Sequence, residues 1–489
     1  MKNIERTKYL AFISNRCGGI HSARLIGGLL LALFAVGSVF ASPPPRMTAT
    51  GNDKGIHGCS LLKGVKRRSY GLGDICGLRE WLGKYGGSLT LLETSEALGN
   101  ATGGVNQGVE YDGLTQAVFQ LDTQRAFHWY GGTFNVSGLQ IHGQNLSEDN
   151  LYTLQTSSGI ESDRATRLWE LWYDQKFDEE GKYDVKIGQQ SLDQEFMSSQ
   201  NALLFVNTMF GWAMLPSADM PGGGPAYPLS ALGVRAHVRP GNSWTLLAGA
   251  FTGNANQQNT SGTAFPLDGT LGIAELQYAY PSLGATVRGG SKTPLSRIYK
   301  LGAWYDSVKF DDQRFDDAGL SLANPASNGV AQTHYGDYAL YAVADQMLWI
   351  DPNESDRSIS VFVRPMGTPL SDRNAVDFSM NAGLTFNEPI MHRDDDTLGV
   401  GMGYAHVSGR STDLDRDQRT YSNSPGLPIR SGETYVEATY QYQVTPWWQV
   451  QPDFQYVFNP GAGIVNPKSS SGQKVKDEAV FGIRMNFAF

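Results

Sequence analysis

Charged and aromatic side chains alternate along residues 161–190 at the two-residue spacing of extended strands. One face of residues 161–174 carries Leu168, Glu170, Trp172 and Asp174, and the other carries Trp169, Leu171 and Tyr173. In the next segment Asp184, Lys186 and Gln190 alternate with Tyr183, Val185 and Ile187. Carboxylates, an amine and an amide beside an indole ring can hydrogen-bond to a polar solute and stack on it. We expect the charged faces to point into water and the others to meet lipid, because a charge facing lipid is expensive.

Four arginines are the best basic candidates for the same water-filled surface, namely Arg235, Arg239, Arg288 and Arg364. Alternation assigns Arg235 and Arg239 inward, since both are out of phase with the apolar set Leu232, Val234, Ala236 and Val238. Arg364 is likewise out of phase with Ile359, Val361 and Val363. For any one residue two interpretations stay open. The charge either hydrates the interior and pairs with its neighbours, or it helps to select a solute.

The chain ends in a strictly alternating segment that indicates how these residues are positioned. Its apolar face carries Phe481, Ile483, Met485, Phe487 and Phe489, and its other face carries Gly482, Arg484, Asn486 and Ala488. From residue 88 onward about seventeen such segments follow one another, and single-chain bacterial barrels have even numbers of strands. The weakest are residues 285–291 and 88–98. We therefore predict an all-β fold, a transmembrane antiparallel β-barrel of about sixteen strands of the outer-membrane type, with no room for long helices.

Alternation alone would also fit a compact β-sandwich, whose apolar faces form a core. The terminal aromatic residue and the number of segments favour the barrel. So do aromatics at segment ends that would form girdles at the membrane surfaces: Trp447, Trp448, Tyr456 and Phe458. A barrel of about sixteen strands leaves an aqueous channel, whereas one of eight is filled by side chains.

Residues 1–41 are predicted to be a signal peptide, because basic residues precede an apolar run that ends in a Val-Phe-Ala cleavage site. The alternative is an uncleaved anchor. Residues 42–87 are predicted to form an N-terminal periplasmic segment and residues 88–489 the transmembrane barrel. No apolar window of about 18 residues remains after residue 41, so any membrane span must use strands. We expect localisation in the bacterial outer membrane, with both chain ends in the periplasm.

The charge balance disfavours a nucleic-acid partner. The formal net charge is −9, and removing the signal peptide takes away five basic residues and one acidic residue, which makes the mature chain more acidic. Cys59 and Cys76 are expected to form a disulfide, with two free thiols as the alternative.

No cofactor and no metal are expected. The eight histidines show no H-E-x-x-H spacing. Residues 413–417 resemble a calcium loop, but Gln418 and Ser424 stand where Gly and Glu are needed, which leaves at most a loose contact with a divalent ion.

Several motifs, in a distinctive order, are similar to those of one family. They are GDICGLREWL at residues 73–82, RLWELWY at 167–173, VKIGQQ at 185–190 leading into DQEF at 193–196, and YKLGAWY at 299–305. Together they resemble the OprB-type carbohydrate-selective porins over roughly residues 73–489. The resemblance implies passive diffusion of glucose and related sugars through the outer membrane, with monosaccharides as solutes, disaccharides and a homotrimer left open, and lipid around the barrel.

Sugar hydroxyls and weakly apolar ring faces suit the side chains that alternate along residues 161–190. The substrate-binding set is therefore predicted to be Glu170, Trp172, Asp174, Lys186, Arg235, Arg239, Arg288 and Arg364. Three alternatives remain: a general diffusion porin, a barrel-borne enzyme, and a secreted carbohydrate-binding β-protein. We expect no enzyme, since no G-x-S-x-G motif occurs. Residues 211–217 and 221–228 belong to a long loop that either folds inward to narrow the pore or lies on the surface.

Overall fold

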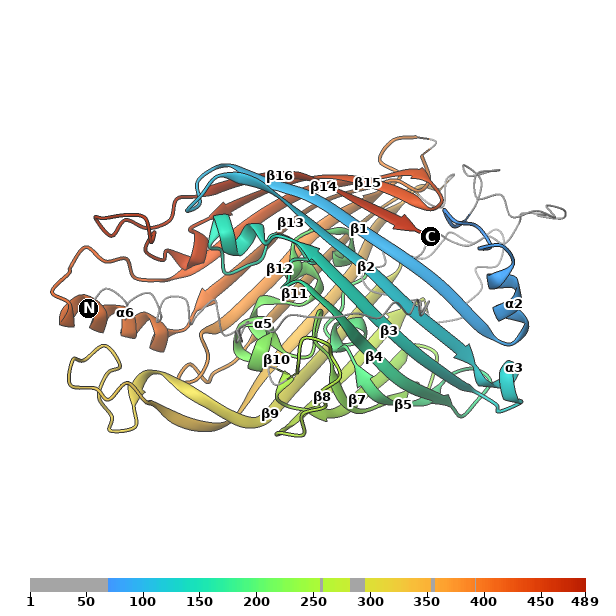
Figure 1. Ribbon diagram of the computed structural model, residues 1–489, viewed down its shortest axis with the longest axis horizontal. Helices are drawn as coiled ribbons and strands as arrows, with labels where there is room; N and C mark the ends of the chain where they lie inside the picture. The colour runs from blue at the N-terminus through green and yellow to red at the C-terminus, as the bar shows by residue number, and fades with distance from the viewer. Residues whose placement is uncertain (1–68, 256–257, 282–294, 353–356, 392) are drawn as a thin grey trace, which may run out of the picture.

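The computed structural model describes residues 69–489 except 256–257, 282–294, 353–356 and 392, and its strands form a closed barrel (Figure 1). Each strand pairs antiparallel with its neighbours in sequence, and β1 closes the barrel against β16. The strands are β1 (Gly87–Thr102), β2 (Gly108–Asp122), β3 (Gly132–Gly143), β4 (Ala165–Lys176), β5 (Tyr183–Gln190), β6 (Ala231–Val238), β7 (Trp244–Thr252), β8 (Thr270–Tyr280), β9 (Arg297–Asp316), β10 (Ala331–Ile350), β11 (Ser358–Gly367), β12 (Val376–Asn387), β13 (Thr397–Val407), β14 (Gly432–Thr445), β15 (Trp448–Phe458) and β16 (Glu478–Ala488).

The described part of the chain thus has the sixteen strands that were predicted. Of the two weakest segments, residues 88–98 lie in β1, and residues 285–291 fall outside the described residues. Residues 1–68 also lie outside them, and these include the whole of the predicted signal peptide, most of the periplasmic segment and Cys59. The signal peptide, the periplasmic segment and the Cys59–Cys76 disulfide therefore stay predictions.

Short helices precede β1 and lie between the later strands. They are α2 (Leu78–Lys84), α3 (Thr123–Phe127), α4 (Thr208–Gly211), α5 (Met214–Asp219) and α6 (Gly409–Tyr421), with single turns η2 (Ser147–Leu151), η3 (Leu192–Gln194), η4 (Ala202–Leu204), η5 (Pro221–Gly223) and η7 (Pro460–Ala462). Within the residues that the structure describes, no helix combines the length and apolar character needed to cross a bilayer.

Helix α6 corrects the expectation that no long helix would follow residue 88, since it has 13 residues. The Ser408 hydroxyl caps it by accepting from the Ser411 amide. Arg314 of β9 donates to Asp417 at 2.7 Å and to Asp413 at 2.9 Å, so two of the carboxylates that resembled a calcium loop hold the helix on the barrel. In Figure 1 α6 lies at one end of the barrel, and α2, α3 and the C-terminus lie at the other.

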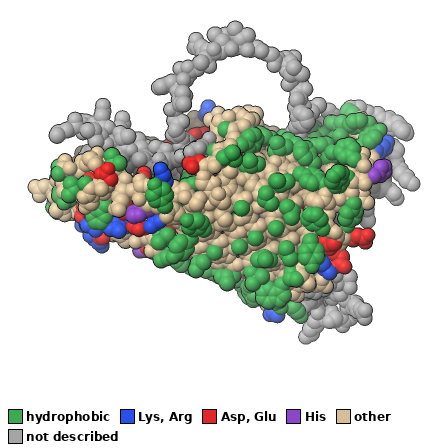
Figure 2. Space-filling view, turned by 90° about the horizontal axis from the view of Figure 1, so that it is seen from below, with side chains coloured by type: hydrophobic (Ala, Val, Ile, Leu, Met, Phe, Trp, Pro, Cys, Tyr) green, Lys and Arg blue, Asp and Glu red, His purple; other side chains and the backbone are tan. Residues whose placement is uncertain are grey.

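The inward and outward faces follow the predicted alternation along most strands. In β11 the side chains of Ser360, Phe362 and Arg364 are buried, while Ile359 and Val361 are only partly buried. The outside of the barrel carries many apolar side chains (Figure 2). In β16 the outward Phe481 is 53% exposed, whereas the inward Arg484 pairs with Glu96 of β1. These faces are those of a membrane barrel with a polar interior.

The C-terminal residue helps to close the barrel. The Phe489 amide donates to the Leu91 carbonyl at 2.7 Å, and Arg79 of α2 donates to the Phe489 carbonyl. Outward rings stack in sequence nearby: Trp448 on Phe487, and Phe487 on Phe489. The terminal aromatic residue therefore packs within the predicted girdle.

A β-bulge overturns one predicted face. Ser137 of β3 pairs with Glu170, but Gly138 pairs with Leu168, so Trp169 is an extra residue between them. The Trp169 side chain is fully buried and donates to the Leu229 carbonyl at 3.2 Å, within a cluster that includes Leu139. The prediction that Trp169 meets lipid is wrong, because the bulge turns this side chain inward. The two-residue alternation that put Leu168 and Glu170 on one face is interrupted between them.

Candidate functional site in the barrel lumen

The long inward loop, residues 191–230 between β5 and β6, folds into the lumen. The Val206 and Asn207 amides donate to the Glu437 carboxylate at 2.6 and 3.1 Å. The Leu215 amide donates to the Ser379 hydroxyl at 3.2 Å. Residues 211–217 and 221–228 belong to this loop, so the inward alternative is the correct one.

Aromatic rings fill the space between this loop and the barrel wall. Phe205 and Phe210 stack with their centroids 4.3 Å apart. Both rings contact Phe362 of β11, and Phe210 also meets Tyr435 of β14 edge to face at 5.4 Å. Burial of these rings stabilises the contact of the loop with the barrel wall.

A second inward loop, residues 144–164 between β3 and β4, packs beside the first. The Leu154 and Gln155 amides both donate to Glu433 of β14 at 2.8 Å. Leu146 and Leu151 share a buried cluster with Val206 of the long inward loop. Wall carboxylates that accept backbone N–H bonds thus anchor both loops, because carboxylates with several N–H donors form strong hydrogen bonds.

Two predicted pore-lining residues hold the long inward loop. Arg364 is fully buried and donates to the carbonyls of Met197 and Gly211 at 2.9 Å each, and also to that of Met209. Glu170 is 5% exposed and accepts from the Ser191 amide at 3.1 Å, where the loop begins. Both point inward as predicted, but their contacts are with the chain, and little of either side chain reaches solvent.

Pairing of β4, β5 and β6 brings three predicted residues into one row. Asp174 lies opposite Lys186, and Lys186 lies opposite Arg235. Directly opposed side chains on one face of a sheet lie within about 5.5 Å at Cβ. The row therefore follows from strand register, which spacing along the chain does not reveal.

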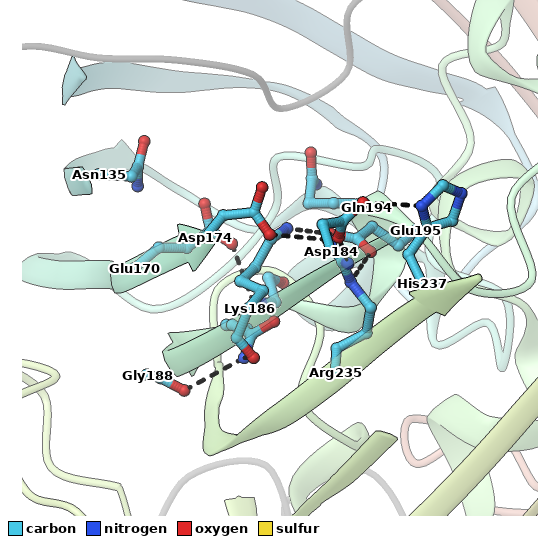
Figure 3. Close-up of polar contacts among 12 residues, drawn as sticks. Asn135, Glu170, Asp174, Asp184, Lys186, Gly188, Gln194, Glu195, Arg235 and His237 are labelled. Carbon is cyan, nitrogen blue, oxygen red and sulfur yellow. Dashed lines mark hydrogen bonds and ion pairs between the residues drawn. The ribbon is translucent and has the colours of Figure 1, made fainter. Parts of the chain in front are cut away.

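Glu195 of the long inward loop lies beside this row, next to Asp184 (Figure 3). Its carboxylate pairs with the Lys186 ammonium and lies 2.6 Å from the Arg235 Nε. Arg235 also pairs with Asp184 of β5. The other carboxylate oxygen of Asp184 lies 2.7 Å from His237 Nδ1. We call Asp174, Asp184, Lys186, Glu195, Arg235 and His237 the lumen charge cluster.

Part of this cluster remains open to solvent. The side chains of Lys186, Glu195 and His237 are 13%, 23% and 18% exposed, whereas that of Arg235 is 8% exposed. The Lys186 ammonium also lies 4.5 Å from the centre of the Trp172 ring. A solute in the lumen therefore meets ammonium, carboxylate, imidazole and indole groups together.

The structure separates the other predicted residues from the cluster. Arg239 follows the end of β6 and donates to the Glu180 carbonyl at 2.8 Å in the turn region. Arg288 lies outside the described residues. The cluster thus contains Asp174, Lys186 and Arg235, with Trp172 against it.

Sequence reasoning missed Glu195, although it lies in the DQEF segment that carried the family resemblance. It also missed Lys300 of β9, which donates to Ser198 of the long inward loop at 3.0 Å and lies 3.7 Å from Glu275. Lys300 could have been found from the YKLGAWY segment, which contains it and which also carried the family resemblance. No group of three or more His, Cys, Asp or Glu side chains is placed to hold a metal ion among the residues that the structure describes.

The geometry agrees with the proteins to which the chain is similar. A family model described as "Carbohydrate-selective porin, OprB family" matches residues 106–489. Porin B of Pseudomonas aeruginosa is 25% identical over 442 residues, covering 84% of this chain and 91% of the relative. The putative porin QuiX of Acinetobacter baylyi is 24% identical over 447 residues, covering 86% and 93%. The high-pH structure of Pseudomonas putida OprB shares the fold with a TM-score of 0.74 at 23% identity, covering 87% of this chain and 99% of that one.

Proposed function

Because this chain belongs to the OprB family of carbohydrate-selective porins, we propose that its sugar selectivity is exercised at the lumen charge cluster. The chain is a porin of the bacterial outer membrane and carries carbohydrates. The observation that supports the cluster as the selective site is the meeting of loop residue Glu195 with wall residues Lys186 and Arg235, where side chains remain partly exposed.

The pairing of charges suits a neutral solute. Lys186 and Arg235 are surrounded by Asp174, Asp184 and Glu195, so acidic and basic groups offset one another over a short distance. Small ions gain little from such a site, whereas a sugar hydroxyl can both donate to a carboxylate and accept from an ammonium. The Trp172 ring beside Lys186 adds an apolar plane for a sugar ring face.

Rapid passage requires that each contact be weak. Conduction needs binding that favours entry and still permits release. A hydrogen bond to a charged group contributes about 1.5–3 kcal/mol when water is excluded, and less in a wet lumen. One substitution should therefore weaken sugar block by roughly tenfold at most, since about 1.4 kcal/mol corresponds to a factor of ten.

The solutes and the surrounding lipid that the sequence predicted are part of this proposal. Monosaccharides are the expected solutes, with disaccharides left open, and lipid surrounds the barrel. A general diffusion pore is the alternative that the conductance experiment addresses. The family and fold are those of a channel rather than of an enzyme.

The test is glucose-dependent block of single channels in planar bilayers. Lys186→Met removes the ammonium from the cluster, and we expect weaker block by glucose with the barrel intact. Lys309→Met is the matched control, because Lys309 lies exposed on the long strand β9, away from the cluster. If Lys186→Met, Glu195→Gln and Trp172→Leu all kept the original glucose affinity while only ion conductance changed, selectivity at this cluster would be disproved.

A further inference from the structure

A basic segment lies between β15 and β16, at the edge of the barrel where β16 meets β1. Residues 459–477 contain three lysines, Lys468, Lys474 and Lys476, in a chain whose formal net charge is −9. The one acidic residue of the segment is Asp477, whose carboxylate accepts from the Asn459 amide at 2.8 Å. All three lysines are exposed. Basic residues gathered at a membrane surface favour anionic lipid headgroups.

The basic segment is folded back on itself, which fixes where two of its lysines lie. The Val475 amide donates to the Ile464 carbonyl at 3.0 Å, and the Val475 side chain is fully buried. The exposed Lys474 and Lys476 lie on either side of Val475 in the chain. The Lys474 ammonium donates to the side-chain oxygen of Asn459 at 3.0 Å. Burial of Val475 therefore leaves both ammonium groups at the surface.

The lysines border the turn that joins β1 to β2. The Gly104 amide in this turn donates to the Lys476 carbonyl at 3.4 Å. The Lys468 ammonium donates to the side-chain oxygen of Asn106 in the same turn. This partner is a neutral amide, so the contact does not offset the charge of Lys468. The turn thus has a basic border.

A hollow of about 460 Å³ lies next to this turn, on the outer surface of the barrel. Gln107, which follows Asn106 in the chain, belongs to its lining. The Lys468 ammonium therefore lies near the edge of the hollow. The lining also includes four apolar or small residues: Gly99, Ala101, Val109 and Phe481.

Gly99 forms the floor of the hollow. Leu98 is buried in a cluster with residues of the inward loops, so alternation turns Gly99 outward. Gly99 lies opposite Val109 of β2 and Phe481 of β16, which are 72% and 53% exposed. Neighbouring strands are about 4.8 Å apart, so the two flanking strands are separated by roughly 9–10 Å. The hollow is therefore a narrow apolar slot between two large side chains, a shape that suits a single hydrocarbon chain.

The slot opens toward lipid at the end of the barrel that carries α6. In Figure 1 β1 runs from the end with α2 and the C-terminus to the end with α6. The Phe481 ring packs on Phe454 of β15 with centroids 4.8 Å apart, which continues the apolar outer surface. Because both chain ends are predicted to be periplasmic, we expect the slot to face the outer leaflet.

We propose that the lysines and the slot together bind one anionic phosphorylated lipid of the outer leaflet. Its phosphate groups would lie at Lys468, Lys474 and Lys476, because phosphate oxygens accept strong hydrogen bonds from ammonium groups. One acyl chain would lie in the slot between Val109 and Phe481. A free phosphate is a poorer occupant, since it would use the lysines and leave the slot empty. The site is separate from the lumen charge cluster, which faces the inside of the barrel.

Native mass spectrometry of the purified protein in a neutral detergent tests the basic half of this site. The probe is lipid A, a phosphorylated lipid with several acyl chains, and we expect one bound molecule per barrel. The triple variant Lys468→Gln, Lys474→Gln, Lys476→Gln should bind it about a hundredfold more weakly, because each lysine near an anionic headgroup contributes roughly a factor of five. The matched control is Lys309→Gln, Arg410→Gln, Arg416→Gln, which removes three positive charges elsewhere and should bind normally. No bound lipid A, or equal loss in both variants, would overturn the proposal.

A second pair of variants tests the apolar half. Ala101→Leu places a larger side chain in the slot and should weaken lipid A binding, whereas Ala342→Leu on the outer face of β10 should not. Inorganic phosphate should compete poorly with lipid A, because it cannot fill the slot. Unchanged binding in Ala101→Leu, or full displacement by inorganic phosphate, would show a site for free anions and refute a lipid site. Block of single channels by glucose should stay unchanged in every variant, so failure here leaves the sugar site untouched.

Discussion

Arg364→Met is expected to loosen the long inward loop and widen the pore. The Arg364 guanidinium is fully buried and donates to the carbonyls of Met197, Met209 and Gly211, which bracket the aromatic segment of the loop. Hydrogen bonds to charged groups stabilise by about 1.5–3 kcal/mol each, so losing the two that measure 2.9 Å removes about 3–6 kcal/mol from the closed position. Such a loss raises the population of loosened loops by a factor of roughly 10²–10⁴.

Other anchors keep the loop within the barrel. The Glu437 carboxylate still binds the amides of Val206 and Asn207, and Glu275 still accepts from the Met197 amide at 2.8 Å. We therefore expect local loosening around residues 197–211 while the barrel stays closed. Methionine has the length to fill the space left by the guanidinium.

The assays are single-channel conductance and liposome swelling with sugars of increasing size. The variant should show higher conductance, noisier open channels and faster entry of disaccharides relative to glucose. Arg239→Met is the control, since Arg239 contacts the turn region and no part of the long inward loop in the described contacts. Unchanged conductance and unchanged size selectivity in Arg364→Met would show that these hydrogen bonds do not position the loop.

Four further predictions concern assembly and topology. Deleting Phe489 should lower the amount of heat-modifiable barrel, because its amide bonds to Leu91 where β1 and β16 close the sheet; normal levels on gels would contradict this. Val361→Arg on the lipid face should cost about 2–4 kcal/mol of barrel stability near the midplane, measured by urea unfolding against Val361→Leu, and equal stabilities would refute the assignment of faces. An epitope inserted at residues 422–426, after α6, should be detected on intact cells, because α6 lies at the end of the barrel opposite the C-terminus. Thiol labelling of the unfolded, unreduced mature protein should fail at Cys59 and Cys76, and two labelled cysteines would show that no disulfide joins them.

Strand number and side-chain faces could be predicted from the sequence because they depend on local alternation. In β11, β12 and β14 the inward polar set and the outward apolar set are those that the pattern indicated. Water lies inside and lipid outside, so each residue type has only one acceptable face. The same reasoning placed Asp174, Lys186 and Arg235 inward before their register was known.

Local alternation fails where one residue is added. The bulge at Trp169 exchanges the inward and outward side chains on one side of it. A two-residue sequence pattern does not reveal where such an extra residue lies. Helix α6 was missed for a related reason, since its polar sequence is stabilised by ion pairs to Arg314, about a hundred residues away in the chain. Both errors concern contacts between segments that are distant in sequence.

By itself, the sequence determined that this chain is a membrane barrel with a charged interior, because hydrophobic periodicity, chain length and the terminal strand are properties of the chain alone. Only the tertiary structure decided which charges can meet a solute. Arg364 and Glu170 are covered by the long inward loop, whereas the same loop brings Glu195 to Lys186 and Arg235. The position of a loop depends on hydrogen bonds and packing with many strands at once, and that information is distributed over the whole barrel.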